Sequence, residues 1–182
     1  MIKGLVPTVI RTLLMLVALH VSPGWAQTNA IASLLPHAQL QGKGNYTWFG
    51  LSIYAISLWS EPPGLTPENL TNTPFALELA YARKLKGKKI AQASIDEMQK
   101  IGIGTTAQHK AWLASMQALF PDVDQSTHLT GFYQPGQATR FFIGDQLLGE
   151  IADPAFGPAF FAIWLHPKTS APPLRHALLG LP

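Results

Sequence analysis

The sequence predicts an α+β fold, with helices packed on one face of a mainly antiparallel sheet. Three observations lead to this prediction. Strand-like stretches come first, two amphipathic helices occupy the middle of the chain, and a series of short hairpin strands is followed by further helices. This order favours segregated layers over alternating β-α units. The 182 residues are enough for one domain with a hydrophobic core.

The N-terminus has the pattern of a cleavable signal peptide. Lys3 and Arg11 precede an apolar run at 13–19, and small residues stand before a cleavage position after Ala26. The run is too short to span a bilayer, which needs about 20 residues. We therefore expect residues 1–26 to be removed.

Cleavage near Ala26 would leave a single domain over 27–182 in the periplasm or outside the cell. The chain has no cysteine, and a disulfide-free exported protein suits a bacterial periplasm better than a eukaryotic extracellular space.

The charge balance gives no indication of nucleic-acid binding. The formal net charge is +3, from 13 Lys and Arg against 10 Asp and Glu. Lys3 and Arg11 would leave with the signal peptide, so the remaining domain would be near +1. We therefore expect no nucleic-acid partner.

The first half of the expected domain contains strands. Residues 39–59 predict two strands, because 46–49 and 51–59 are rich in aromatic and β-branched residues. Residues 75–82 alternate, with apolar side chains on one face. The segment 27–35 is expected to be a loose lead-in.

Two helices follow. The first opens at Gly87, carries its apolar residues on one arc and ends at Gly102. The second begins with a capping box formed by Thr105 and Gln108 and ends before Pro121.

A three-stranded meander is predicted at 128–134, 138–143 and 147–151. Asp153 followed by Pro predicts the start of a helix with Asp153 as its N-cap. Its inward-facing residues would be Phe156, Phe160, Ile163 and Trp164, and a last short helix would end at Gly180.

Four segments in order resemble the chalcone isomerase-like family, specifically its exported bacterial branch. The first resembles the family's LxGxGxR and YxxxLY strand pair, and the others match its helix opening, its late hairpin and its C-terminal helices. The matching residues are 40–46 with 54–59, 85–89, 133–136 with 144–151, and Phe156 with 163–167 and 174–180. The resemblance implies an open-faced β-sandwich with a ligand cleft between sheet and helices.

The resemblance also places the family's catalytic residues. The family arginine falls on Tyr46, the strand threonine on Tyr54, the helix tyrosine on Ile90, the helix asparagine on Glu97, and a late Ser or Thr near Ile163. None of these residue types is retained. A fixed guanidinium is the natural partner of a buried oxyanion, and a neutral hydroxyl does not replace it. We therefore expect no chalcone cyclisation.

Two alternatives could supply the cleft with a polar group in place of the family arginine. A one-residue slip would place Asn45 at the arginine position, which restores no charge. The resemblance also implies that non-catalytic relatives bind fatty acids through the same arginine. Here a carboxylate could meet Lys43 or Arg140 instead, although nothing in the sequence selects them.

The aromatic residues of the first strands therefore predict an apolar cleft for a hydrophobic small molecule, either a lipid or a fatty-acid-like compound. The alternative is that they are simply sheet core. The expected ligand-binding residues are Tyr46, Trp48, Tyr54, Tyr81 and Ile90.

Two further functions remain open. One is an intramolecular lyase or isomerase with altered residues, using Tyr46, Tyr54 and Glu97. Glu97 would be a general base if its helix face lines the cleft, but the helical wheel places it at the edge of the polar arc. The other is an accessory protein that acts through a partner.

The densest basic run indicates either peripheral contact with an anionic membrane or a solvated strand–helix corner. It consists of Arg83, Lys84, Lys86, Lys88 and Lys89.

No cofactor or metal is expected, because no nucleotide-binding motif and no metal-ligand spacing of His or Cys occurs. His109 is expected to pack against its helix neighbours, and His166 to cap carbonyls at a helix end.

Overall fold

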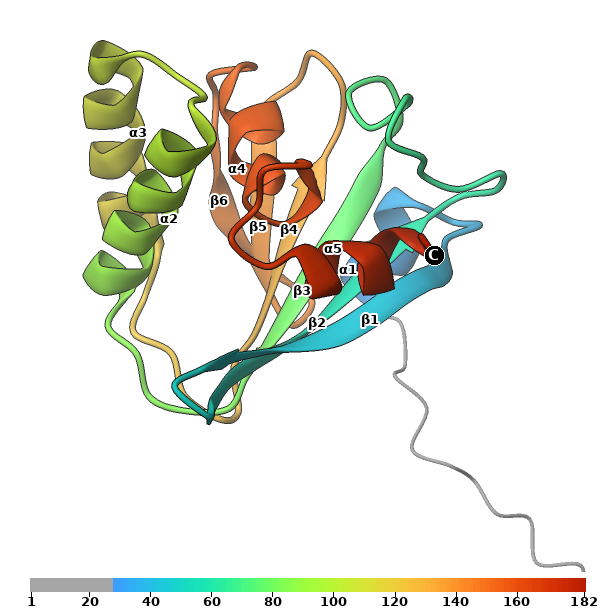
Figure 1. Ribbon diagram of the computed structural model, residues 1–182, viewed down its shortest axis with the longest axis horizontal. Helices are drawn as coiled ribbons and strands as arrows, with labels where there is room; N and C mark the ends of the chain where they lie inside the picture. The colour runs from blue at the N-terminus through green and yellow to red at the C-terminus, as the bar shows by residue number, and fades with distance from the viewer. Residues whose placement is uncertain (1–27) are drawn as a thin grey trace, which may run out of the picture.

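The computed structural model describes residues 28–182 (Figure 1). The predicted signal peptide, residues 1–26, lies outside this range. Six strands form one antiparallel sheet in the order β1-β2-β3-β4-β5-β6. Helices α2 to α5 cover one face of the sheet (Figure 1). The predicted α+β class and open-faced architecture are confirmed.

From residue 39 onward, the elements follow the order expected from the sequence. The strands are β1 (Gln39–Trp48), β2 (Leu51–Ser60), β3 (Phe75–Tyr81), β4 (His128–Tyr133), β5 (Thr139–Ile143) and β6 (Gln146–Ile151). The helices are α1 (Asn29–Leu34), α2 (Gly87–Ile101), α3 (Thr106–Leu119), α4 (Phe156–Leu165) and α5 (Pro172–Leu179).

The main core lies between the sheet and helices α2 to α5. β3 alternates as predicted, with Phe75, Leu77, Leu79 and Tyr81 all in this core. The helices α2 and α4 add apolar side chains above them. Aromatic rings of β3, β5 and α4 pack edge to face. This geometry stabilises the core by more than the burial of apolar area alone.

The expected loose lead-in is wrong, because α1 forms there and packs on the opposite face of the sheet. Thr28 caps it by accepting from the Ile31 N–H at 3.3 Å, and the Ala30 N–H donates to Asp145 at 3.0 Å. Ile31 is fully buried against a second, smaller core that includes Phe132. Such a short helix gains its stability from docking rather than from intrinsic propensity.

The start of α4 also differs from the prediction. Asp153 is not the N-cap, because the helix begins at Phe156. The Asp153 carboxylate instead accepts the indole N–H of Trp112 at 2.8 Å and the Ala155 N–H at 2.9 Å. The partner on α3 holds Asp153 outside the helix.

The capping box of α3 is confirmed, with Thr105 and Gln108 bonded reciprocally. α2 ends at Gly102, whose φ of 84° is left-handed. None of the helices within 28–182 combines the length and hydropathy that a bilayer crossing requires.

Of the predictions for His109 and His166, the first is confirmed and the second is wrong. His109 is half-buried against Trp112, as expected, and its Nε2 lies 2.7 Å from the Ile103 carbonyl. His166 does not cap carbonyls: its Nδ1 accepts the Lys168 N–H at 3.0 Å. Two other side chains bond carbonyls in the last turn of α4: Arg175 donates to that of Leu165 at 2.8 Å, and Thr169 to that of Ile163 at 2.6 Å.

Candidate ligand-binding cavity

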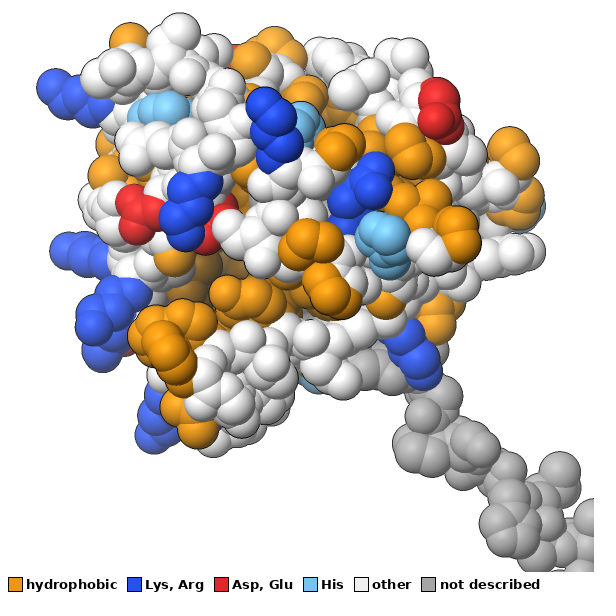
Figure 2. Space-filling view, in the orientation of Figure 1, with side chains coloured by type: hydrophobic (Ala, Val, Ile, Leu, Met, Phe, Trp, Pro, Cys, Tyr) orange, Lys and Arg blue, Asp and Glu red, His pale blue; other side chains and the backbone are white. Residues whose placement is uncertain are grey.

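A cavity of about 560 Å³ lies between the sheet and the helical layer. Its floor comes from β1 to β3, and its walls from α2, α4 and the segment before α5. Figure 2 shows the surface hollowed between α2 and the β1–β2 hairpin, with hydrophobic side chains at its edge. Its lining includes Tyr46, Tyr54, Tyr81, Ile90, Glu97 and Trp164.

Three tyrosines form a row across the floor. Tyr46 is paired with Tyr54, and Tyr54 with Tyr81, on adjacent strands. Directly opposite residues share a face of the sheet, so the three side chains meet. The Tyr46 and Tyr54 rings are stacked with centroids 5.1 Å apart, and Tyr54 and Tyr81 meet edge to face at 6.0 Å.

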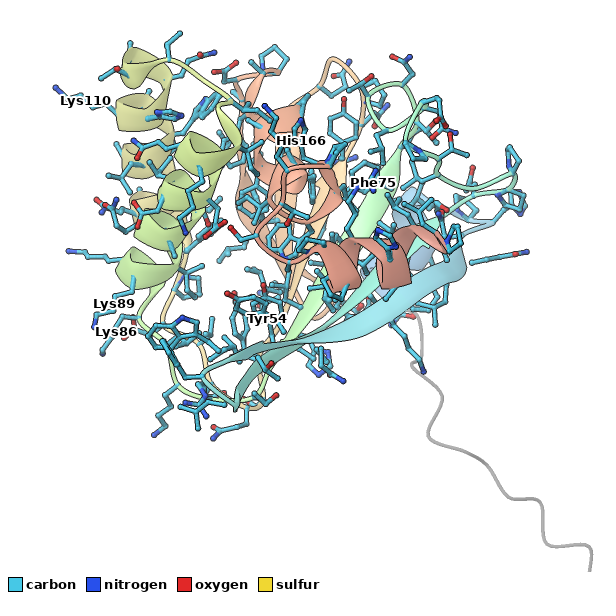
Figure 3. All side chains as sticks on the ribbon, viewed as in Figure 1. Tyr54, Phe75, Lys86, Lys89, Lys110 and His166 are labelled. Atoms are coloured by element: carbon cyan, nitrogen blue, oxygen red, sulfur yellow. The ribbon has the colours of Figure 1, made fainter. Side chains whose placement is uncertain are left out.

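Tyr54 is the best-defined hydroxyl of the cavity (Figure 3). Its oxygen accepts the indole N–H of Trp164 from α4 at 2.9 Å. No acceptor for the Tyr54 proton lies among residues 28–182, so this hydroxyl can donate to a ligand.

Burial raises the pKa of Tyr54 well above its usual range, against the opposing effect of the Trp164 hydrogen bond, although the ring keeps some surface open to the cavity. Burial also raises the pKa of Tyr81. Both side chains are therefore neutral hydroxyls near neutral pH.

Glu97 lies at the mouth. Its two oxygens accept from Lys100 at 2.6 Å and from the Ser170 hydroxyl at 2.5 Å. The hydrogen bond to Glu97 raises the pKa of Lys100. The helical wheel was a poor guide to this residue, because it compares positions within α2 and omits the loop that brings Ser170 to its carboxylate.

The five positions at which the resemblance places family catalytic residues all line this cavity: Tyr46, Tyr54, Ile90, Glu97 and Ile163. Of the other expected ligand-binding residues, Tyr81 lies in the floor and Trp48 at the mouth, with 59% of its surface exposed. The structure thus brings every predicted site residue together. Their contact with a ligand stays a prediction.

The alternative polar groups lie elsewhere. Side chains alternate along a strand, so Asn45 and Lys43 point to the face opposite Tyr46. Arg140 lies over the Phe132 ring, with 4.8 Å from its guanidinium carbon to the ring centroid. Neither a register slip nor these cations supplies the cavity with a guanidinium, and no arginine belongs to its described lining.

The sequence did not reveal the polar partners of the site. Trp164 was expected only as an inward-facing core residue. Ser170 belongs to no motif. Only the hydrogen bonds across 110 and 73 positions of sequence show what Trp164 and Ser170 do.

A sequence profile described as chalcone isomerase-like matches residues 24–180. The chain belongs to the chalcone isomerase-like family. An uncharacterized protein of Haemophilus influenzae is similar to this family member, with 34% identity over 151 residues, which are 82% of this chain and 71% of that protein.

A solved structure with the same fold is the fatty-acid binding protein of Arabidopsis thaliana. The TM-score is 0.59 at 12% identity, and the match covers 79% of this chain and 87% of the other. At that identity the likeness shows a shared chalcone isomerase-like fold.

In the part of the chain that the structure describes, no group of three or more His, Asp or Glu side chains is arranged to hold a metal ion.

Proposed function

We propose that this chain is an exported binding protein that holds a hydrophobic small molecule, a lipid or fatty-acid-like compound, in the cavity. The observation that carries the proposal is a cavity of about 560 Å³ walled mainly by aromatic and aliphatic side chains. Small-molecule sites have volumes of about 300–1,000 Å³ and combine apolar walls with a few polar groups. The name of the Arabidopsis protein with this fold supports the same ligand class.

The polar end of the cavity favours a neutral or weakly polar head group. Four charged side chains line it, and their signs cancel: Lys89 and Lys100 against Asp96 and Glu97. Lys100 is already bound to Glu97. The Tyr54 hydroxyl, with its proton unused, is the group best placed to bind a ligand oxygen.

The same geometry disfavours a lyase or isomerase. The family arginine position is occupied by Tyr46, which provides no fixed positive charge for an oxyanion. Glu97, the candidate base, has hydrogen bonds to both carboxylate oxygens. The raised pKa of Tyr54 keeps its hydroxyl protonated, so it is a donor rather than a base.

The test is native mass spectrometry and organic extraction of the protein purified from its own host. We expect a stoichiometric hydrophobic ligand and a protein mass consistent with cleavage near Ala26. Ala93→Trp places a large ring at the cavity wall on α2 and should abolish ligand retention. Ala111→Trp on α3 is the matched control, because Ala111 is also an exposed helical alanine but does not line the cavity.

Titration of delipidated protein with a long-chain fatty acid and with the corresponding alcohol identifies the head group. We expect the alcohol to bind at least as tightly as the acid. Glu97→Gln removes a negative charge from the mouth and should tighten only the acid, by about tenfold. The proposal would be contradicted if the purified protein were empty and bound neither compound. It would also be contradicted if Ala93→Trp retained as much ligand as wild type.

A further inference from the structure

The tip of the β1–β2 hairpin exposes large apolar side chains. Trp48, Phe49 and Leu51 are 59%, 86% and 48% exposed. Phe49 and Gly50 form a two-residue turn, and both have positive φ angles of 47° and 74°.

Phe49 is a poor residue for this turn. A two-residue turn with both φ values positive favours Asn, Asp or Gly, because their side chains tolerate the left-handed region. A bulky side chain there is strained. Its ring meets the neighbouring exposed Trp48 ring edge-on, with centroids 4.8 Å apart, so the two rings together present an apolar surface to a partner outside the chain.

The basic corner, Arg83 to Lys89, lies beside this tip. The Arg83 Nε donates to the Ser52 carbonyl at 2.8 Å, directly after the hairpin turn. Figure 3 shows Lys86 and Lys89 at the end of α2 nearest the hairpin, and Figure 2 shows basic side chains next to hydrophobic ones on this edge.

The corner carries a net positive charge. Its five basic side chains outnumber the two acidic ones that adjoin it, Asp122 and Asp124. Asp122 is bound to Lys86 at 2.7 Å, which neutralises that lysine. Lys84 and Lys88 are exposed. Lys84 lies within electrostatic range of Asp124, but the excess of positive charge on the corner remains available to an external anion.

This surface is continuous with the mouth of the cavity. Trp48 belongs to the hairpin tip and Lys89 to the basic corner, and both also line the cavity. A flat partner that covers the tip and the corner would therefore also cover the cavity mouth.

We propose that the hairpin tip and the basic corner dock onto an anionic phospholipid bilayer. Phe49 and Leu51 enter the boundary between head groups and acyl chains, while Lys84 and Lys88 meet lipid phosphates. The purpose of docking rests on the proposed function: a hydrophobic ligand passes between bilayer and cavity without crossing water.

Vesicle co-sedimentation of the protein as purified from its host tests the proposal. We expect binding to phosphatidylglycerol–phosphatidylethanolamine vesicles, weaker binding to phosphatidylcholine vesicles, and a marked loss at high salt, which screens surface charge. Replacing Lys84 and Lys88 by Gln should weaken binding on the order of 25-fold, at about fivefold per lysine. Replacing Phe49 and Leu51 by Ser should weaken it at least about tenfold.

Two matched controls replace exposed residues that do not line the cavity. Leu147→Ser removes an apolar side chain that is 55% exposed on β6, and Lys110→Gln removes a charge at the far end of the helical layer (Figure 3). Both should bind vesicles like wild type. The proposal would be overturned if the tip and corner variants bound vesicles as well as wild type does. It would also be overturned if wild type bound no vesicles and instead self-associated through the tip, with the self-association lost in the tip variant.

Ligand occupancy separates this proposal from the preceding one. Phe49, Leu51, Lys84 and Lys88 do not line the cavity, so their variants should keep the ligand in vesicle-free solution. If the purified protein contained no ligand but bound vesicles, the docking proposal would stand and the ligand-binding function would be contradicted. If it contained ligand but bound no vesicles, the ligand-binding function would stand and docking would be contradicted.

Discussion

The two ends of the β1–β2 hairpin belong to the same pair of strands but have opposite relations to the helical layer. At one end α5 packs directly on β1, and β2 is buried from Ile56 to Ser60. At the other end the helices diverge from the strands, β2 is exposed at Leu51, and the cavity lies between Tyr46 and α2.

The difference depends on side-chain size along β1. Gly42 and Gly44 face α5, and a Cβ on Gly42 would overlap the backbone oxygens of Ala177 and Leu178. Two residues further along the same face stands Tyr46, whose ring stacks on Tyr54 and lines the cavity. Small residues thus allow close packing at one end of the sandwich, and large rings line its open end.

The largest expected effect comes from the closed end. Gly42→Ala should lower the free energy of unfolding by about 3 kcal/mol, because α5 must move away from β1. Urea denaturation measures the change. Gly44→Ala is the matched control: its added Cβ meets only the end of the Leu174 side chain, which can rotate, so a loss of about 1 kcal/mol or less is expected. Equal losses would contradict the close-approach explanation.

At the open end, Tyr54→Phe should destabilise by about 1–2 kcal/mol at neutral pH, because the Trp164 indole N–H loses its acceptor. Tyr81→Phe is the matched control, since no described hydrogen bond depends on its hydroxyl. A smaller loss in Tyr54→Phe than in Tyr81→Phe would contradict the assigned role of the hydroxyl.

The two tyrosines also predict an alkaline dependence of stability. Burial raises the pKa of both in the folded state. The folded chain therefore holds protons that the unfolded chain has lost, and stability falls as pH rises above about 10. Each tyrosine contributes a slope of up to about 1.4 kcal/mol per pH unit. Either Phe variant should reduce this slope in denaturation series across alkaline pH, and an unchanged slope would show that neither hydroxyl is buried.

The smallest effect has the opposite sign and lies at the hairpin tip. Phe49→Asn should stabilise the protein by about 0.5–1 kcal/mol, because Asn tolerates a φ of 47° better than Phe. Thermal unfolding checks it, with Leu147→Asn as a control on exposed apolar replacement. A destabilised variant would mean that the contact between Trp48 and Phe49, with ring centroids 4.8 Å apart, outweighs the strain.

Local pattern was sufficient where each element interacts with its own neighbours in sequence. The alternation of β3, the apolar arc of α2 and the capping box of α3 follow from periods and spacings within a few residues. α1 and Asp153 could not be predicted in this way. One gains stability by docking on the far face of the sheet, and the other binds an indole on α3.

The sequence alone determined the fold class and singled out the tyrosines that lie on the floor of the cavity. The tertiary structure decided which polar groups accompany them: Trp164 on Tyr54, and Lys100 with Ser170 on Glu97. The periodicity of a sequence predicts which face of a helix or strand is apolar, but it does not predict which distant side chain contacts that face. The mouth of the cavity is built from such meetings, so only the packed layers show it.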